Sequence, residues 1–62
     1  MCELTVYLLD EDREELVMED VATITPDGER LVLTDLLGQQ KIVEARLKEL
    51  KLLEHKIFVT GK

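Results

Sequence analysis

The chain has 62 residues, a formal net charge of −6, 45% hydrophobic residues and one cysteine. This length allows a single small domain, residues 1–62, which buries only about 60% of the surface that its unfolded chain exposes. One cysteine excludes an internal disulfide framework, and no apolar run reaches the roughly 20 residues of a membrane span. The first residues also lack the basic and apolar regions of a signal peptide, so we expect a cytoplasmic protein.

The charges are unevenly distributed. Residues 1–20 contain eight acidic residues and one basic residue, a net charge of −7, whereas residues 41–62 contain three acidic and six basic residues, a net charge of +3. We expect these two regions to form ion pairs with each other. Nucleic-acid-binding proteins show a basic face with stacking aromatic side chains. The acidic balance and a total of two aromatic residues, Tyr7 and Phe58, therefore argue against nucleic acid as a partner.

Residues 3–9 show the period-two pattern of a β-strand, with Leu4, Val6 and Leu8 on one face. The acidic run DEDREE at residues 10–15 is too polar for a core element. It predicts an exposed hairpin turn, with a second strand leading out of it.

The centre of the chain predicts another hairpin. Residues 21–25 (VATIT) alternate cleanly as a strand, and residues 26–28 (PDG) form a turn signal, because proline presets φ and glycine accepts a positive φ. Residues 29–35 return as a strand. Residues 37–38 (LG) mark a further reversal, after which residues 39–45 resume an extended pattern.

Residues 43–54 allow two alternative predictions. Four apolar residues in this segment recur at helical spacing, namely Val43, Leu47, Leu50 and Leu53. Local propensity therefore favours a helix of about three turns, although neither a convincing N-cap nor a C-cap glycine brackets it. Residues 56–60 (KIFVT) clearly form a strand, and the preceding segment could instead be a strand that pairs with it.

Several short strands separated by turns predict a small barrel or a strongly bent sheet. Such a sheet has edges that invite pairing with another chain, and a small domain often gains stability from a partner. A symmetric homodimer is the expected assembly, since C₂ is the commonest closed symmetry.

The sequence contains no constellation typical of catalysis, so we expect a protein that is not an enzyme. Gly28, Gly38 and Gly61 are isolated and form no phosphate-binding loop. Cys2 and His55 are far apart in sequence, and nothing positions a third member of a nucleophilic site.

Cys2 offers half of a metal site. If Met1 is removed, Cys2 presents an α-amine and a thiolate that close a five-membered chelate ring. If Met1 is retained, its amine, the Cys2 amide nitrogen and the thiolate still lie within chelating reach. Nitrogen and thiolate donors suit Ni(II) or Cu(II). One chain supplies too few donors, but two chains at a two-fold axis could supply an N₂S₂ set.

Each metal-ligand candidate also has a structural alternative. Cys2 could be a small hydrophobic residue at the start of the first strand. His55 is a second candidate ligand, although its sequence context predicts the tip of a hairpin. Met18 fits a core position better than a thioether ligand.

The opening MCE, an extended first strand and the run from EELVMEDV through DLLGQQ to KIFVT resemble the CooT family of small nickel-binding proteins. The resemblance covers essentially the whole chain. It implies a homodimeric, mainly β protein with a small SH3-like barrel of about six or seven short strands. In that family the cysteine at the position of Cys2 holds one Ni(II) at the dimer interface, together with an adjacent nitrogen from each subunit. The resemblance also implies that ARLKELKLL, residues 45–53, is extended.

The characterised CooT protein is tied to maturation of a nickel-containing carbon monoxide dehydrogenase. We therefore expect a nickel metallochaperone whose Cys2 residues hold Ni(II) for a nickel enzyme or its maturation machinery. Two alternatives remain open. Related sequences have been described as RNA-binding proteins, and the acidic segment at residues 11–15 could instead dock a protein partner without any metal.

Overall fold

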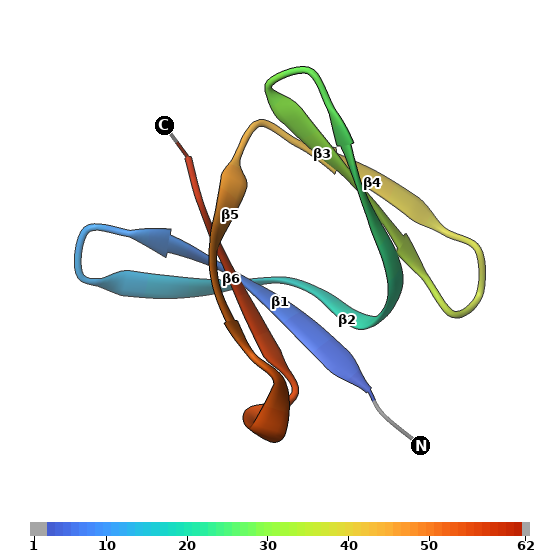
Figure 1. Cartoon of the computed structure of the whole chain (residues 1–62), viewed down its shortest axis with the longest axis horizontal. Helices are drawn as coiled ribbons and strands as arrows, with labels where there is room; N and C mark the ends of the chain where they lie inside the picture. Colours follow the sequence, from blue (N-terminus) through green and yellow to red (C-terminus); the bar gives the residue numbers. More distant parts are fainter. Residues whose placement is uncertain (1–2, 62) are drawn as a thin grey trace.

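The computed structural model describes residues 3–61, which form one six-stranded β-sheet and a short 3₁₀ turn (Figure 1). The elements in chain order are β1 (Leu4–Asp10), β2 (Arg13–Asp27), β3 (Arg30–Asp35), β4 (Gln40–Val43), β5 (Arg46–Lys51), η1 (Leu52–Glu54) and β6 (Lys56–Thr60). In space the strands follow the order β4-β3-β2-β1-β6-β5. Neighbouring strands are antiparallel except β1 and β6, which run parallel.

β2 is a single bent strand of 15 residues, where the sequence predicted two strands. Its first half pairs with β1 and its second half pairs with β3, with irregular register near the bend. Asp20 lies there with a φ of 54°. Its carbonyl accepts a hydrogen bond from the Leu36 amide at 2.9 Å, and the Lys41 Nζ donates to the Val17 carbonyl at 3.3 Å. These contacts tie the bend of β2 to the other end of the sheet.

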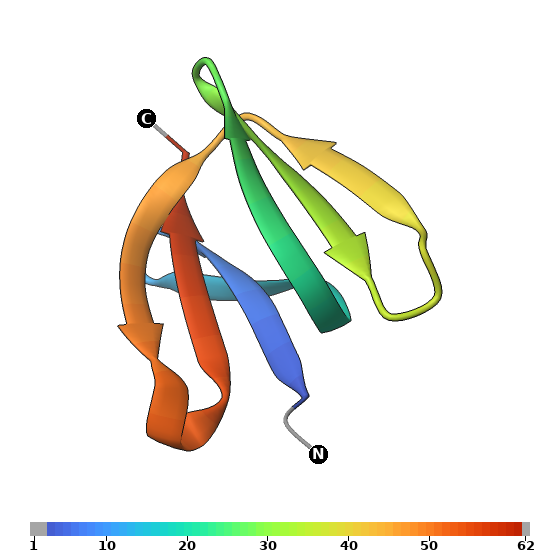
Figure 2. The same ribbon diagram turned by 45° about the vertical axis from the view of Figure 1, so that its right-hand side comes forward.

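The core lies on the inner face of the curled sheet (Figure 2). It consists of residues whose apolar side chains are strongly buried: Val6, Val21, Leu31, Leu33, Ala45, Ile57 and Val59. Leu4 and Leu8 pack against this cluster with Val6 at its centre, which confirms the face predicted for the first strand. Met18 also packs against the cluster and is partly buried, so its predicted core role is confirmed.

Residues 43–54 do not form the helix of about three turns that local propensity favoured. The extended alternative is confirmed for Arg46–Lys51, whereas Leu52–Glu54 form a 3₁₀ turn. β5 pairs with β6, and Leu47 and Leu50 lie opposite Val59 and Ile57. Two strand residues separated by three positions normally face opposite sides of a sheet. A register irregularity between Leu47 and Glu49 reverses this parity. The leucine spacing that indicated a helix is therefore also compatible with a bulged strand.

The predicted mainly β fold with six strands is confirmed, but the sheet curls without closing into a barrel. β4 and β5 lie at its two ends and are not paired with each other. An open sheet leaves unpaired backbone groups along these outer strands. Within residues 3–61, no helix is long and apolar enough to cross a membrane.

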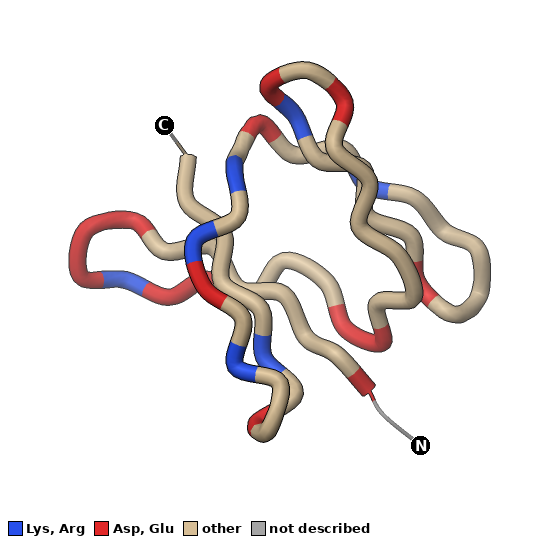
Figure 3. The backbone as a smooth tube through the Cα atoms, viewed as in Figure 1, with Lys and Arg blue, Asp and Glu red and all other residues tan. Residues whose placement is uncertain are grey.

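Among residues 3–61, the acidic first third and the basic last third do not form the ion pairs predicted between them. In the part of the chain that the structure describes, the ion pairs join near neighbours: Arg30 with Asp27 at 3.9 Å and Lys56 with Glu54 at 3.8 Å. Figure 3 shows acidic residues gathered on the β1–β2 turn and basic residues along β5 and the start of β6. The acidic β1–β2 turn and the basic residues of β5 and β6 therefore form no ion pairs with each other within residues 3–61.

Replacing Leu33 by alanine is expected to lower the free energy of unfolding by about 2–5 kcal/mol, because its fully buried side chain would leave a cavity. Urea denaturation followed by circular dichroism measures this loss. Leu53→Ala is the matched control, since Leu53 is 99% exposed and its truncation should change stability by no more than about 0.5 kcal/mol. Equal losses in the two variants would contradict the assignment of the core.

Candidate metal centre at the amino-terminal end of the sheet

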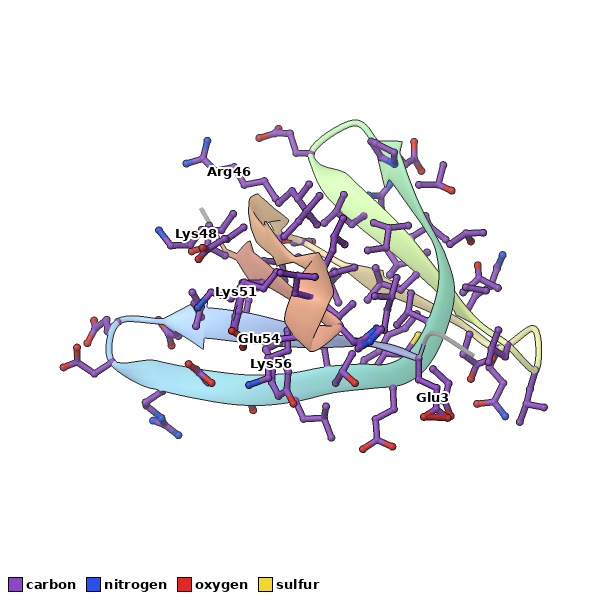
Figure 4. All side chains as sticks on the ribbon, turned by 60° about the horizontal axis from the view of Figure 1, so that its bottom comes forward. Glu3, Arg46, Lys48, Lys51, Glu54 and Lys56 are labelled. Carbon is purple, nitrogen blue, oxygen red and sulfur yellow. The ribbon has the colours of Figure 1, made fainter. Side chains whose placement is uncertain are left out.

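Cys2, the metal ligand predicted from the sequence, lies outside the residues that the structure describes. The description starts at Glu3, an exposed residue directly before β1. Figure 4 shows Glu3 at the start of this strand, apart from the labelled basic side chains. The assignment of Cys2 as a ligand therefore stays a prediction, and the surroundings that can be described are those of the beginning of β1.

The turn that contains His55 lies beside the beginning of β1. The Thr5 amide donates a hydrogen bond to the His55 carbonyl at 3.0 Å, and Thr5 is opposite Lys56 in the parallel β1–β6 register. His55 itself adopts a left-handed conformation with φ 58° and ψ 37°, and its amide donates to the Leu52 carbonyl at 3.2 Å. His55 therefore occupies the predicted turn, and the fold brings this turn to the same end of the sheet as the start of the first strand.

Two leucines give this end of the molecule an apolar character. Leu52 and Leu53 form most of η1 and are 61% and 99% exposed. Glu54 and Lys56 form an exposed ion pair next to them. The end of the sheet near Glu3 thus combines exposed apolar side chains with one imidazole.

Residues 3–61 contain no group of three or more histidine, cysteine, aspartate or glutamate side chains that could hold a metal ion. The full sequence has one cysteine and one histidine. A nitrogen–sulfur site would therefore need backbone or amino-terminal nitrogens, or donors from a second chain.

Two surface hollows lie elsewhere on the molecule. One lies at the bend of β2 and the start of β4 and includes Glu19, Asp20, Asp35 and Lys41 in its lining. The other lies between the β2–β3 turn and the connection from β4 to β5. Among the described residues that line them, neither hollow includes a histidine.

Tyr7 and Phe58, the two aromatic residues of the sequence, form a stacked pair that local sequence patterns did not predict. Tyr7 and Phe58 stack with ring centroids 5.7 Å apart. The Nζ of Lys51 lies 5.6 Å from the Phe58 centroid, and that of Lys56 lies 5.9 Å from the Tyr7 centroid. The parallel β1–β6 register, which places Tyr7 opposite Phe58, creates this contact. Long-range strand pairing of this kind leaves no local signal in the sequence.

Together these features define a small, open β-sheet domain with no catalytic constellation among its described residues.

Residues 1–60 match the family profile of the CO dehydrogenase accessory protein CooT. The chain is 36% identical over 61 residues to an uncharacterized protein from Methanocaldococcus jannaschii, covering 98% of this chain and all of that protein. An uncharacterized protein from Archaeoglobus fulgidus is 41% identical over 44 residues, which cover 71% of this chain and 98% of that protein.

A crystal structure assigned to CooT from Carboxydothermus hydrogenoformans superimposes with a TM-score of 0.91 at 34% sequence identity, covering 98% of each chain. The chain therefore belongs to the CooT family of CO dehydrogenase accessory proteins. This membership confirms the resemblance drawn from the MC start and the MEDV and LLG segments.

Replacing His55 by glycine removes the imidazole without disturbing the turn, because glycine adopts the left-handed conformation of this position without steric cost. We expect His55→Gly to keep or raise the free energy of unfolding by up to about 1 kcal/mol. His55→Val should lower it, since a β-branched side chain is strained at positive φ. Thermal unfolding of both variants tests this, and equal stability would contradict the described turn.

Proposed function

We propose that this protein is a nickel metallochaperone that carries Ni(II) as cargo for the maturation of a nickel enzyme. Its membership of a CO dehydrogenase accessory family is the observation that carries the proposal. The proposed recipient is a carbon monoxide dehydrogenase-like enzyme or its maturation machinery. The chain itself is proposed to bind and release the metal ion without catalysing a reaction.

The proposed ligands are the Cys2 thiolate and the neighbouring backbone or amino-terminal nitrogen from each of two chains. Thiolate and nitrogen donors fit the planar coordination that Ni(II) favours. The sequence supports a shared site, because one cysteine per chain cannot supply two thiolates. The proposed assembly is therefore a cytoplasmic homodimer with one Ni(II) ion between its subunits.

Two properties of the fold support an assembly of this kind. The sheet is open, with β4 and β5 as outer strands, and such strands can associate with other chains unless they are protected. Several large apolar side chains are also exposed, including Leu37 at 84% and Leu53 at 99%. A domain of this size gains stability when a partner covers such surface.

Native mass spectrometry with Ni(II) tests the proposal directly. The parent protein is expected to bind one nickel ion per dimer, and the same spectrum reports whether Met1 is removed. Cys2→Ser and Cys2→Ala should weaken nickel binding at least about ten-fold, because they remove a direct ligand of the proposed site and even changes to the groups behind the ligands cost about 10–100-fold in metal affinity. Circular dichroism serves as the control for folding. Nickel binding by Cys2→Ala at parental affinity, or by a monomer of the parent, would refute the shared site.

Nickel affinity should also fall as the pH is lowered. Protons compete with the metal for the thiolate and the nitrogen donors, so binding releases protons and weakens in acid. Titration calorimetry in buffers of different ionisation enthalpy measures this proton release. A pH-independent affinity would rule out thiolate ligation.

A competing function is a metal-independent interaction module. The β1–β2 turn exposes a run of acidic residues that includes Glu11, Asp12, Glu14 and Glu15. In that case reversing the charges of Glu11 and Glu15 would abolish partner binding, and Cys2→Ala would leave it unchanged. RNA binding has less support: Phe58 is only 6% exposed and both aromatic rings already contact lysines, so they offer little surface on which bases could stack.

A further inference from the structure

β4 is the outer strand at one end of the curled sheet (Figure 2). Among residues 3–61 it pairs with β3 alone, in a register without irregularities. The other outer strand, β5, carries four charged side chains in its six residues, whereas β4 carries one, that of Lys41. Charged side chains, especially lysines, commonly protect an outer strand against further pairing. β4 is therefore the less protected of the two outer strands.

A hydrogen bond at the β3–β4 turn determines which backbone groups of β4 are free. Hydrogen-bonded and non-hydrogen-bonded pairs alternate along two antiparallel strands. The Asp35 amide donates to the carbonyl of Gln39, the residue before β4, at 2.9 Å. By alternation, the second and fourth residues of β4 bond to β3. The first and third residues, Gln40 and Ile42, therefore direct their backbone N–H and C=O groups away from β3.

The pairing of β2 with β3 supports the same alternation. Pro26 of β2 lies opposite Leu31 of β3, and proline has no N–H with which to complete a hydrogen-bonded pair. The backbone groups of Leu31 therefore face β4, where the opposite residue is Val43. Val43 thus bonds to β3, and the neighbouring Ile42 does not.

The β3–β4 turn holds the start of β4 in a fixed position. The Asp35 Oδ1 accepts hydrogen bonds from the Leu37 and Gln39 amides at 2.9 and 2.8 Å. The Asp35 carbonyl accepts one from the Gly38 amide at 3.0 Å, and the Leu36 amide donates to the bend of β2 at 2.9 Å. All four amides from residue 36 to residue 39 are thus bonded. A preorganised strand loses little conformational entropy when it binds another chain.

The side chains of β4 leave its open side accessible. Residues directly opposite each other on neighbouring strands share a face. Lys41 therefore lies on the inner face with Leu33, and its Nζ is engaged by the Val17 carbonyl at 3.3 Å. Ile42 lies on the outer face with Val32 and is 58% exposed. The open side of β4 thus combines free backbone groups with an exposed β-branched side chain.

The surroundings of β4 are acidic. The hollow beside its start is lined by Glu19, Asp20 and Asp35, with Lys41 as the basic residue. The exposed Glu44 directly follows its end, where two arginines share the second hollow. Residues 19–44 contain six acidic and two basic residues, a net charge of −4. A basic segment complements this charge, whereas a second copy of the same edge would oppose it.

We propose that β4 receives an extended, basic segment of a partner protein as an added strand of the sheet. The segment pairs with the outward N–H and C=O groups of Gln40 and Ile42. In strand addition, main-chain hydrogen bonds supply affinity and alternate side chains supply specificity. The exposed Ile42 and the acidic hollow near Gln40 favour a segment that combines β-branched with basic residues. The inference goes beyond the proposed function and does not rest on nickel binding.

A designed peptide tests the added strand. The probe is a short blocked peptide that alternates valine with threonine and carries lysines at both ends, and it is titrated into isotope-labelled, metal-free protein. NMR-detected exchange of the Gln40 and Ile42 amides should be rapid in the free protein and at least about ten-fold slower with saturating peptide. The Lys41 and Val43 amides should be protected in both states. The same peptide with its pairing amides N-methylated should not bind.

Proline substitution tests the outward N–H groups. Ile42→Pro should leave the β3–β4 pairing intact, because proline is tolerated on an outer strand where its nitrogen faces solvent. It removes one donor and should weaken peptide binding at least about ten-fold. Ile42→Thr is the matched variant, since it keeps the donor and a β-branched side chain, and should change affinity no more than about three-fold. Gln40→Pro repeats the test at the second position, and circular dichroism checks folding.

Charge exchange tests the basic character of the segment. Glu19→Lys should weaken binding of the lysine peptide about three-fold or more and strengthen binding of a counterpart with glutamates in place of the lysines. Glu14→Lys makes the same charge change beside the β1–β2 turn, away from β4 (Figure 1). It is the matched control and should leave the affinity for either peptide nearly unchanged.

Several results would refute the added strand. They are equal binding of the peptide by I42P and I42T, binding of the N-methylated peptide, or a preference of the parent protein for the glutamate peptide. Slow exchange of the Gln40 and Ile42 amides in the protein alone would also refute it, because a second copy would then occupy the edge. Cys2→Ser should bind the peptide as the parent does, so the result is independent of the proposed nickel site.

Discussion

Parallel pairing of β1 with β6 joins strands that are about fifty residues apart, and most of the molecule depends on it. The five paired positions, from Thr5–Lys56 to Leu9–Thr60, place Val6 and Val59, both fully buried, within the core. Without this pairing the β5–β6 hairpin would have no neighbour in the sheet. The same register stacks Tyr7 on Phe58 outside the core and brings the His55 turn to the beginning of β1. The core, the Tyr7–Phe58 stack and the position of the His55 turn therefore all depend on the β1–β6 pairing.

β2 is the second element that shapes the sheet. Because its two halves pair with different strands, it turns the sheet back on itself and allows a small number of apolar residues to meet. The bend costs regular hydrogen bonding, and the Lys41 and Leu36 contacts replace part of it. The curvature is still insufficient to close a barrel, so β4 and β5 remain outer strands. Charged side chains on β5 protect that strand against uncontrolled association.

Local patterns in the sequence predicted much of the fold. Period-two alternation located β1, β3 and β6, and the turn residues around Gly28 and Gly38 located two reversals, both with positive φ in the structure. Residues 43–54 were harder to predict, because a bulge in β5 produces a spacing of leucines that equally suits a helix. The two strands predicted from Glu15 to Thr25 are one strand, since bulges bend β2 without a turn residue that would mark the change.

Features that depend on long-range pairing could not be predicted from local patterns. The adjacency of His55 and Thr5, the Tyr7–Phe58 stack and the placement of Lys56 over the Tyr7 ring all require the β1–β6 register. The ion pairs predicted between the first and last thirds are absent among residues 3–61 for the same reason, because the net charges of two segments do not determine which of their faces meet. The prediction that Cys2 is a metal ligand has a different basis. It rests on the donor chemistry of the thiol and on its position next to the amino terminus.

The topology of the sheet also has a consequence for how the protein is made. β6 is synthesised after every other strand, yet it occupies a place between β1 and β5. During translation β1 can pair with β2 but must wait for the rest of the chain before its other side is covered. Long-range pairings of this type slow folding, because the chain loses the entropy of closing a long loop before the stabilising contacts between the strands form. The arrangement that surrounds the start of β1, including the His55 turn, therefore forms only after β6 has been synthesised.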